Sequence, residues 1–331
     1  MRKMTKLATA IALTLAASSA MAAYKPSVIF DMGGKFDKSF NQAAYAGAEE
    51  FKKATGISYG EFEITNEAQR EQAMLRMAQR GFSPIVAVGF QQAPVVEKVA
   101  KKFPNTKFVI IDSVVDLPNV RSVVFKEQEG SFLVGALAAM KSESHSVGFV
   151  GGMAIPLIKK FACGYEQGAK YISKDTKVLQ NMTGTTPAAW NNPTKGGELA
   201  KSQFDQGVDV VYAAAGGTGV GVYQAAKDSG KFAIGVDSNQ NHIHPGTMLT
   251  SMVKRVDVAV RTAFEDVQTG KFTPGLQVLG LAQEGVGWAL DENNRPLISP
   301  EMQGKLDKLR QEIISGKIKV HDWNTTQSCT Y

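Results

Sequence analysis

The chain has 331 residues, of which 44% are hydrophobic, 21% charged and 8% aromatic, and its formal net charge is +6. These values are typical of a soluble globular protein and exclude disordered, collagen-like and coiled-coil chains. Arg2, Lys3 and Lys6 supply half of the net charge, so the remainder is too small and too scattered to predict nucleic-acid binding. The length predicts two domains, each able to bury its own core.

Residues 1–22 predict a cleaved export signal. The basic stretch MRKMTK is followed by the apolar LATAIALTLAA and by Ala20-Met21-Ala22, the order of parts found in secretory signals. We expect cleavage after Ala22, in preference to a buried N-terminal helix. No Cys follows this site, so we expect no lipid anchor there and a mature protein free in the periplasm. A chain exported unfolded brings no cytosolic cofactor with it, and we expect none.

The sequence holds two cysteines, Cys163 and Cys329. In an oxidising compartment they can pair and tie the C-terminal tail to the helix around Cys163. Two separate thiols are the open alternative, because a disulfide requires Cα atoms within about 7 Å of each other and spacing in sequence does not show that distance.

From residue 27 onward, short runs rich in Val, Ile and Phe alternate with longer amphipathic segments. The apolar runs, which predict strands, are SVIFDM, GEFEIT, PIVAVG, KFVIID, RSVVF, SVGFVG, KVLQNM, VDVVYAAA, KFAIGVD and TMLTSMV. The segments between them predict helices over 40–54, 67–80, 92–103, 129–142, 157–173, 193–206, 219–229 and 255–269. Near-continuous apolar strands separated by helices indicate βαβ units and buried parallel sheets, hence an α/β fold.

Two stretches of the chain, 28–51 and 147–172, resemble each other. Each predicts a strand, a loop and a helix, and in each a Phe (Phe40, Phe161) is followed seven residues later by Gly-Ala. The second stretch falls where the second lobe of a duplicated α/β protein would begin. Because parallel strands present their C-terminal ends at one edge, we predict two lobes that bind a small molecule in the cleft between them.

Polar and aromatic residues follow the predicted strands or begin the adjacent helices. They are Asp31, Asp37, Ser39, Phe40, Asn41, Asp112, Trp190, Gly217, Asp237 and Lys254. Carboxylates accept hydrogen bonds from vicinal hydroxyls, a Lys donates and an Asn does both. Two aromatic rings, one from each lobe, can sandwich a flat ring. Together these groups suit a ligand made of a base and a sugar.

Each of these residues also has an ordinary structural role. An Asp at the end of a strand often forms a turn, and Asp37 or Ser39 can cap the helix that begins at Phe40. A single Trp in a loop is often packed against the protein itself. The prediction of a site depends on several such residues coinciding at the cleft-facing ends of both sheets.

The segment GGTGVG resembles a dinucleotide-binding loop, and Asp237 follows Gly217 by about 20 residues. The third Gly of G-x-G-x-x-G is missing, however, since Val222 stands at that position. With the export signal, this departure disfavours a nicotinamide enzyme. The loop can instead present backbone N–H groups to a polar ligand at the start of a helix.

Catalytic and metal-binding motifs are weakly represented. His242 and His244 alternate in NQNHIHPG and could ligate a metal, but no third ligand stands at an accepted spacing, which favours a polar loop. No G-x-S-x-G elbow or recognisable Cys/His pairing is found. Because spacing in sequence does not give separation in space, paired carboxylates keep an exported nucleoside hydrolase open as an alternative.

Six motifs in order, DMGGKFDKSFNQ, KEQEGSFLVGALAA, VGFVGGM…P…F…GYEQGAK, VVYAAAGGTGVGVYQAAK, AIGVDSNQ and TSMVKRVD, resemble the basic-membrane-protein (PnrA-like) family of ABC-transporter solute-binding proteins. The resemblance runs from about residue 26 to 270. It implies a type I periplasmic-binding fold, in which a hinge of several crossings joins two Rossmann-like lobes with parallel sheets. It also implies a non-enzymatic receptor that delivers a nucleoside, often a purine one, to an ABC permease and its ATPase. We expect a monomer.

The resemblance also assigns roles to residues of the predicted site. It places Phe40 against the base, with Asp31 and Asn41 beside it in the first lobe. It places Trp190 as the opposite stacking residue, and it puts Asp112, Asp237 and Lys254 near the base and ribose groups. Two positions depart from the family pattern: Trp190 stands where Phe is common, and Asn239 where Asp is common. Members that bind other flat ligands, including riboflavin, leave the ligand open.

The domain limits follow from where we expect the chain to cross between lobes, near residues 126–130, 252–257 and 282–288. They are 23–127 with about 255–285 for the first lobe, and 128–254 with about 286–331 for the second.

A further function class on this scaffold is a ligand-sensing partner of a membrane receptor, which the sequence does not distinguish from a transporter component.

Overall fold

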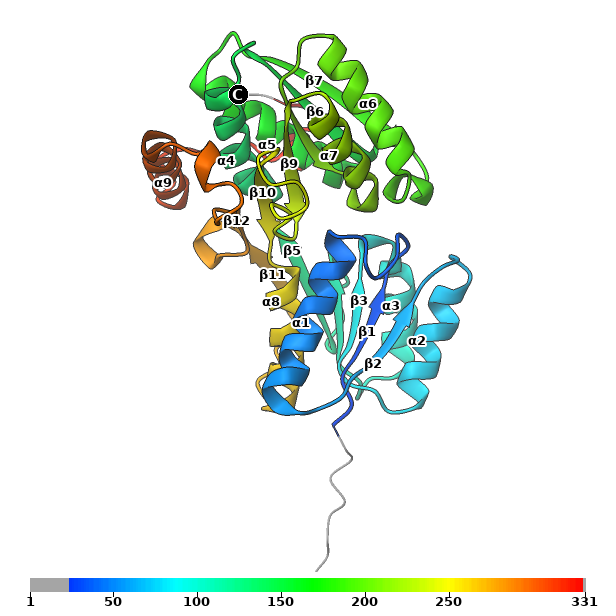
Figure 1. Cartoon of the computed structure of the whole chain (residues 1–331). Coiled ribbons are helices and arrows are strands. Elements are labelled where there is room, and N and C mark those ends of the chain that lie inside the picture. The colour runs from blue at the N-terminus through cyan, green and yellow to red at the C-terminus, as the bar shows by residue number, and fades with distance from the viewer. Residues whose placement is uncertain (1–23, 330–331) are drawn as a thin grey trace, which may run out of the picture.

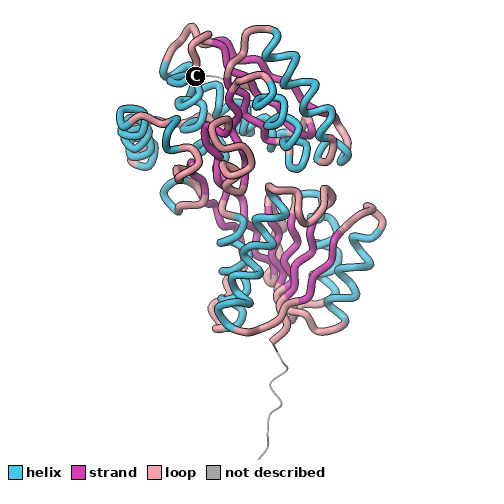
Figure 2. Tube along the Cα trace, in the orientation of Figure 1, coloured by secondary structure: helices cyan, strands magenta, loops and turns pink. Residues whose placement is uncertain are grey.

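The computed structural model describes residues 24–329, so the predicted export signal lies outside the described residues. This part of the chain forms two α/β lobes, one above the other in Figure 1. Each lobe is built on a six-stranded sheet, and helices flank the strands in both (Figure 2). The prediction of two α/β lobes with mostly parallel sheets is confirmed.

The sheet of the first lobe has the order β2-β1-β3-β4-β5-β11, and all its strand pairs are parallel. Its strands are β1 (Ser27–Phe30), β2 (Gly60–Glu63), β3 (Ile85–Val88), β4 (Phe108–Ile111), β5 (Val120–Phe125) and β11 (Gly275–Leu279). The helices of this lobe are α1 (Phe40–Thr55), α2 (Gln69–Gln79), α3 (Ala93–Lys102) and α8 (Val256–Gln268). Every residue of β1, β3 and β4 is buried, because helices cover both faces of the sheet.

The sheet of the second lobe repeats this order as β7-β6-β8-β9-β10-β12. Its strands are β6 (Ser146–Met153), β7 (Lys177–Gly184), β8 (Val210–Ala214), β9 (Phe232–Asp237), β10 (Met248–Lys254) and β12 (Val286–Trp288). Its helices are α4 (Glu127–Lys141), α5 (Pro156–Ile172), α6 (Pro193–Asp205), α7 (Gly219–Asp228), α9 (Pro300–Ile314) and the short α10 (Trp323–Thr326). Only β12 runs antiparallel to its neighbour among the described strands. The shared order makes β4 the counterpart of β9, and β5 that of β10.

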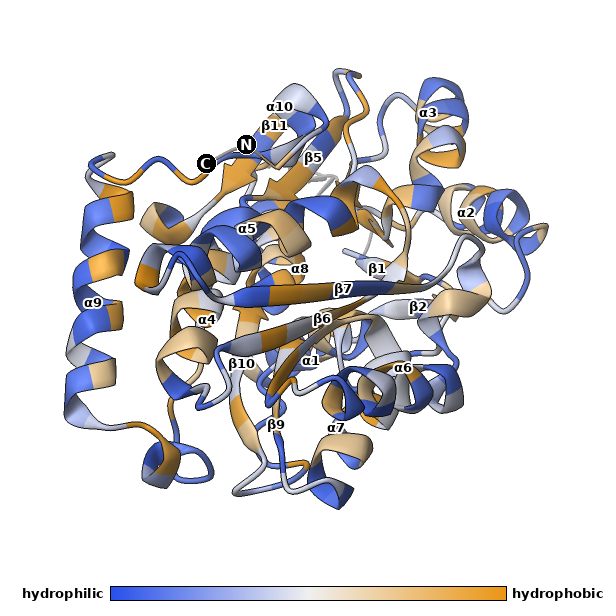
Figure 3. Ribbon diagram, turned by 90° about the horizontal axis from the view of Figure 1, so that it is seen from above, coloured by the Kyte–Doolittle hydropathy of each residue, from blue (hydrophilic) through white to orange (hydrophobic). Residues whose placement is uncertain are grey.

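The predicted strands and helices between residues 27 and 269 are all present, with ends that differ by a few residues. The strands β11 and β12 and the helix α9 were not predicted. β12 has three residues, too few to show a period, and β11 is a half-exposed edge strand. The helix α9 buries one narrow stripe, Leu306, Leu309 and Ile313, and alternates between hydrophilic and hydrophobic segments in Figure 3.

Three chain crossings join the lobes within the described residues. The chain leaves the first sheet after β5 and enters α4 at Glu127. It returns from β10 through Arg255 into α8, and it crosses again between β11 and β12 over residues 280–285. The strands β5, β10, β11 and β12 accordingly lie in the middle of the molecule in Figure 1.

The C-terminal tail is fastened to α5 in the second lobe. Cys163 on this helix forms a disulfide with Cys329, with their Cα atoms 5.4 Å apart. Gln167, one turn further along the helix, donates to the carbonyl of His321 and accepts from its N–H. The residues that face the tail, Lys160, Cys163 and Gln167, recur at helical spacing on one side of α5.

Candidate functional site

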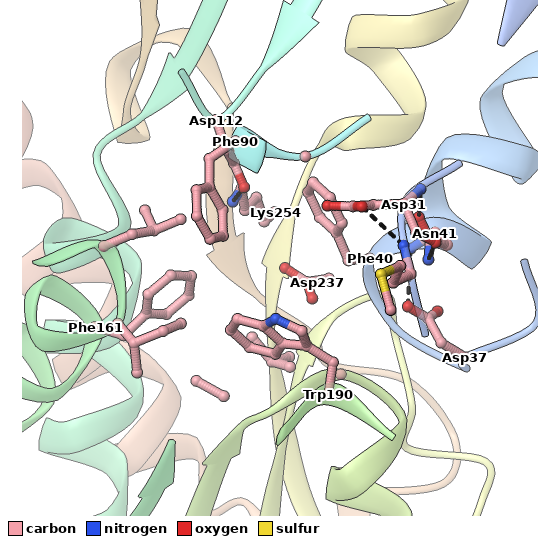
Figure 4. A pocket seen from close by; sticks show the side chains of 17 residues that line it. Asp31, Asp37, Phe40, Asn41, Phe90, Asp112, Phe161, Trp190, Asp237 and Lys254 are labelled. Carbon is pink, nitrogen blue, oxygen red and sulfur yellow. Dashed lines mark hydrogen bonds and ion pairs between the residues drawn. The ribbon is translucent and has the colours of Figure 1, made fainter. Parts of the chain in front are cut away.

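A pocket lies between the two lobes at the C-terminal ends of their strands. It contains about 610 Å³ of space not filled by protein atoms, part of which is open to solvent. The predicted residues that line it are Asp31, Asp37, Phe40, Asn41, Asp112, Trp190, Asp237 and Lys254 (Figure 4). Ser39 and Gly217 do not line it, and Gly216 lies in the lining in place of Gly217. Gly217 packs behind the lining, where a Cβ would lie 3.4 Å from the carbonyl oxygen of Trp190.

The strand ends explain why residues far apart in sequence meet here. Asp112 directly follows β4, and Asp237 ends the counterpart strand β9. Both have φ in the left-handed region, 67° and 62°. An Asp adopts this conformation more readily than most residues because its short polar side chain bonds locally. The two acids are therefore turned into the cleft from equivalent positions in the two sheets.

Aromatic side chains enter the pocket from both lobes. Phe40 begins α1 in the first lobe, and Trp190 ends a short 3-10 helix, Pro187–Trp190, in the second. The backbone of Gly152 makes room for the indole, since a Cβ there would lie 2.1 Å from the Trp190 ring. Both rings appear beside the pocket in Figure 4.

Two further aromatic residues, Phe90 and Phe161, line the pocket and were not predicted from the sequence. Phe90 follows β3 after Gly89, so the rule that selected the other residues, a ring directly after a strand, would have found it. Phe161 was recognised as the counterpart of Phe40 in the repeat but was not assigned to the site. The repeat therefore carried a signal that α5 contributes a ring to the pocket.

Asp31 is held rigidly at the wall of the first lobe. Its carboxylate accepts hydrogen bonds from the N–H of Met32 (2.8 Å) and from Nη2 of Arg70 (3.0 Å). Asn41 accepts from the N–H of Asp31 through Oδ1 and donates to its carbonyl through Nδ2. Burial raises the pKa of Asp31, and the Met32 N–H and the Arg70 guanidinium oppose that rise. Arg70, which does not line the pocket, is a supporting residue that the sequence analysis did not identify.

Asp37 both lines the pocket and caps α1. Its carboxylate accepts hydrogen bonds from the N–H groups of Ser39, Asn41 and Gln42, which satisfies donors that a helix start leaves unpaired. Burial raises the pKa of Asp37 to about 7, although these three N–H groups act in the opposite direction. The structural alternative considered for Asp37, a helix cap, is therefore correct.

Direct hydrogen bonds join the lobes beside the pocket. The hydroxyl of Ser39 donates to Oδ2 of Asp237 at 2.6 Å, and the hydroxyl of Ser238 donates to the carbonyl of Ser39 at 2.8 Å. Nε2 of Gln240 donates to the carbonyl of Lys38 at 2.8 Å. These contacts bring the loop before α1 against the end of β9, so the lobes are closed on each other here.

Lys254 is the cation of the pocket. Its Nζ lies 2.6 Å from Oδ2 of Asp112 and 3.1 Å from Oε1 of Glu127, and 5.1 Å from the ring centre of Phe40. Burial lowers the pKa of Lys254, but the surrounding carboxylates outweigh burial and raise it above its usual range. Lys254 is therefore charged. Burial raises the pKa of Asp112 to about 6, with Lys254 opposing the rise and Glu127 adding to it.

The described residues offer no metal centre. No cluster of three or more His, Cys, Asp or Glu side chains within residues 24–329 is arranged to hold a metal ion. Asn239 donates to Asp291 at 2.7 Å and does not line the pocket. The polar part of the lining consists of carboxylates, the Asn41 amide and one ammonium, and the apolar part consists of aromatic rings and aliphatic side chains. Such a lining suits a flat and hydroxylated molecule.

A pocket between two α/β lobes that are joined by three crossings defines a ligand-binding protein of the periplasmic-binding class. The chain belongs to the family of PnrA-like (Bmp) ABC transporter substrate-binding proteins, whose model matches residues 25–324. It is similar to the crystal structure of an ABC transporter solute-binding protein from Aeropyrum pernix, with a TM-score of 0.83, 32% identity and coverage of 90% of this chain and 93% of that one.

Two relatives extend the comparison. An ABC transporter nucleoside-binding protein, BmpA of Lactococcus lactis, is 32% identical over 89% of this chain and 88% of its own length. An uncharacterised lipoprotein of Pyrococcus furiosus is 36% identical over 89% of this chain and 77% of its own length. The family acts outside the cytoplasm. Within residues 24–329, no helix has both the length and the apolar character needed to span a bilayer.

Proposed function

We propose that this protein captures a purine nucleoside in its cleft and delivers it, unaltered, to the permease of an ABC transporter. The observation that carries the proposal is that Phe40 and Trp190, from different lobes, line one pocket with buried acids and a buried ammonium. Rings from two lobes suit a flat base, and carboxylates suit the vicinal hydroxyls of ribose. The name of the Lactococcus lactis relative, a nucleoside-binding protein, supports the same ligand class.

The contacts of the lining residues support individual roles in the proposed binding. Phe40 and Trp190 stack on the base, while Asp31 and Asn41, locked together by their backbone hydrogen bonds, bind polar groups at the wall of the first lobe. Asp237 and Lys254 bind the sugar hydroxyls or the base from the floor of the cleft. Binding between the lobes holds them together and creates the closed surface that a permease recognises.

The protein acts as a periplasmic monomer released by cleavage after Ala22, without a lipid anchor. This proposal differs from the description of some relatives as lipoproteins. Mass spectrometry of the protein from an exporting cell tests it. A mature chain that begins at residue 23 without an added lipid is expected, and a lipidated N-terminus would contradict the proposal.

The ligand is tested by a thermal-shift screen of the purified chain over inosine, guanosine, adenosine, free bases, riboflavin and sugars, because a ligand that binds only the folded state raises the melting temperature. Titration calorimetry on the positive compounds then ranks them. Nucleosides are expected to bind most tightly. Equal affinity for the free base would show that the sugar is not bound. Binding of riboflavin alone would show that the ligand is riboflavin and not a nucleoside.

Hydrolysis is the second function to be tested, because two carboxylates in the cleft share one hydrogen-bonding partner. Asp37 accepts a hydrogen bond from the N–H of Ser39, and Asp237 accepts one from the Ser39 hydroxyl. The protein is incubated with inosine for hours and the products are separated by chromatography. We expect inosine to be recovered intact. Accumulation of hypoxanthine in proportion to protein concentration would show that the chain is a nucleoside hydrolase instead of a receptor.

A further inference from the structure

Four buried charged side chains form a continuous series beside the pocket. Nζ of Lys160 lies 2.7 Å from Oε2 of Glu127, Oε1 of Glu127 lies 3.1 Å from Nζ of Lys254, and that Nζ lies 2.6 Å from Oδ2 of Asp112. No side chain in the series is more than 9% exposed. The signs alternate, so each buried charge has an opposite neighbour, as buried charges require. We call these four residues the hinge ion series.

The series crosses the hinge between the lobes. Asp112 follows β4 of the first lobe, whereas Lys254 ends β10 just before the chain crosses to α8. Glu127 is the first residue of α4, just after the chain has crossed from β5, and Lys160 lies on α5. Lys254, Glu127 and Lys160 therefore belong to the second lobe. Separation of the lobes would part Lys254 from Asp112 while leaving Lys254 beside Glu127.

We propose that Glu127 and Lys160 are positioning residues for Lys254: Glu127 holds the ammonium at the floor of the cleft, and Lys160 holds Glu127. Neither Glu127 nor Lys160 lines the pocket, whereas Lys254 and Asp112 do. Lys160 also donates to the carbonyl of Phe125 at 2.6 Å, which fixes it to the end of β5. The proposed role deepens the proposed function, since it concerns how a binding residue of the same site is presented.

The charges that face each member of the series predict that neutralising Glu127 and neutralising Lys160 have opposite effects on the pKa of Asp112. Lys254 faces Asp112 and Glu127 directly and Asp237 at longer range, and Lys160 faces Glu127 directly and Asp322 at 3.8 Å. When Glu127 is neutral, the ammonium of Lys254 interacts with Asp112 alone, and that interaction becomes stronger. When Lys160 is neutral, Glu127 has only Lys254 as a close cation, so Glu127 attracts Lys254 more strongly and the interaction of Lys254 with Asp112 becomes weaker.

The test uses the ligand-free protein and follows the carboxyl carbon of Asp112 by ¹³C NMR during a pH titration. Glu127→Gln should lower the pKa of Asp112 by about one pH unit, and Lys160→Met should raise it. The double variant Glu127→Gln/Lys160→Met removes one charge of each sign, so it leaves no buried charge without a partner if a single variant fails to fold. The pKa of Asp112 in this double variant should match that in Glu127→Gln. The control is Glu71→Gln, which removes the carboxylate of an exposed ion pair with Lys98 and should leave Asp112 unchanged.

Shifts in the same direction for both single variants, or no shift in either, would overturn the proposal. A second readout is the affinity for inosine by calorimetry, which should fall about tenfold or more in each single variant and be retained in Lys160→Arg. If the wild-type chain binds no nucleoside but Asp112 shifts as stated, the proposed function fails and the positioning role stands. If inosine binds the wild type and Asp112 does not shift, the positioning role fails alone.

Discussion

The hydroxyl of Ser39 in the first lobe donates a hydrogen bond to the buried carboxylate of Asp237 in the second lobe, at 2.6 Å. It is one of several contacts between the loop before α1 and the end of β9. The bond ties an acid of the pocket to the opposite lobe, so closure of the lobes and the orientation of Asp237 are coupled.

Ser39→Ala should weaken nucleoside binding by about 1.5–3 kcal/mol, the range for a hydrogen bond to a charged group. The closed form loses a contact while the open form, in which the two residues are apart, loses none. Calorimetry measures the affinity, and small-angle scattering with saturating ligand should show a larger radius of gyration than for the wild type. Ser58→Ala, at an exposed position, is the control. Unchanged affinity in Ser39→Ala would show that the hydrogen bond between Ser39 and Asp237 does not stabilise the closed form.

Truncating either stacking ring should cost binding free energy without unfolding the chain. Phe40→Ala and Trp190→Ala are each expected to weaken nucleoside binding by about 1–3 kcal/mol, the range for stacking of a base on an aromatic side chain. Trp190→Phe keeps an aromatic ring and should retain most of the affinity. If both alanine variants bind as tightly as the wild type, the base does not lie between these rings.

Reduction of the disulfide between Cys163 and Cys329 should destabilise the folded chain by about 2–5 kcal/mol. The bond closes a loop with a sequence separation of 166, and it fastens the tail to the helix that carries Phe161 and Lys160. Urea unfolding of the oxidised protein, the reduced protein and Cys163→Ser/Cys329→Ser measures the difference. The reduced protein and the double variant should agree, and equal stability of all three would show that the tail contributes little.

The free energy of unfolding should fall as the pH rises from about 5 to 8. Burial raises the pKa of Asp37 to about 7 and that of Asp112 to about 6, above their unfolded values near 4. Between those limits these two carboxyl groups bind more protons in the folded chain than in the unfolded chain, so their contribution to stability is largest at the acidic end. The lowered pKa of Glu127 acts below about pH 4.5, outside this range.

Urea unfolding at several pH values measures this dependence, which should amount to about 4 kcal/mol at most. Asp37→Asn removes the titrating group at the start of α1 but keeps an oxygen that can cap the helix. This variant should therefore show a shallower slope than the wild type. A stability that increases steadily from pH 5 to pH 8 would contradict the expected sign.

Much of the fold could be predicted because its signals are local. The runs SVIFDM and KFVIID each contain an unbroken apolar stretch, VIF and FVII, that is followed directly by an Asp. These stretches form the buried strands β1 and β4, with Asp31 and Asp112 directly after them. The helix α9 was missed because only a narrow stripe of it is buried. Gly217 was placed in the lining, where Gly216 stands, because a sequence pattern does not show which of two adjacent glycines faces the cleft.

The sequence by itself determined the order of strands and helices between residues 27 and 269, the duplication, and the kinds of side chain at the strand ends, since periodicity and turn chemistry act over a few residues. Only the tertiary structure decided which of those side chains meet. The residues around Glu127 and Lys160 in the sequence do not predict that these two form an ion pair with each other, or that Glu127 forms one with Lys254. Such pairs depend on how two sheets and three crossings pack together, and a buried charge can be placed only where that packing supplies its partner.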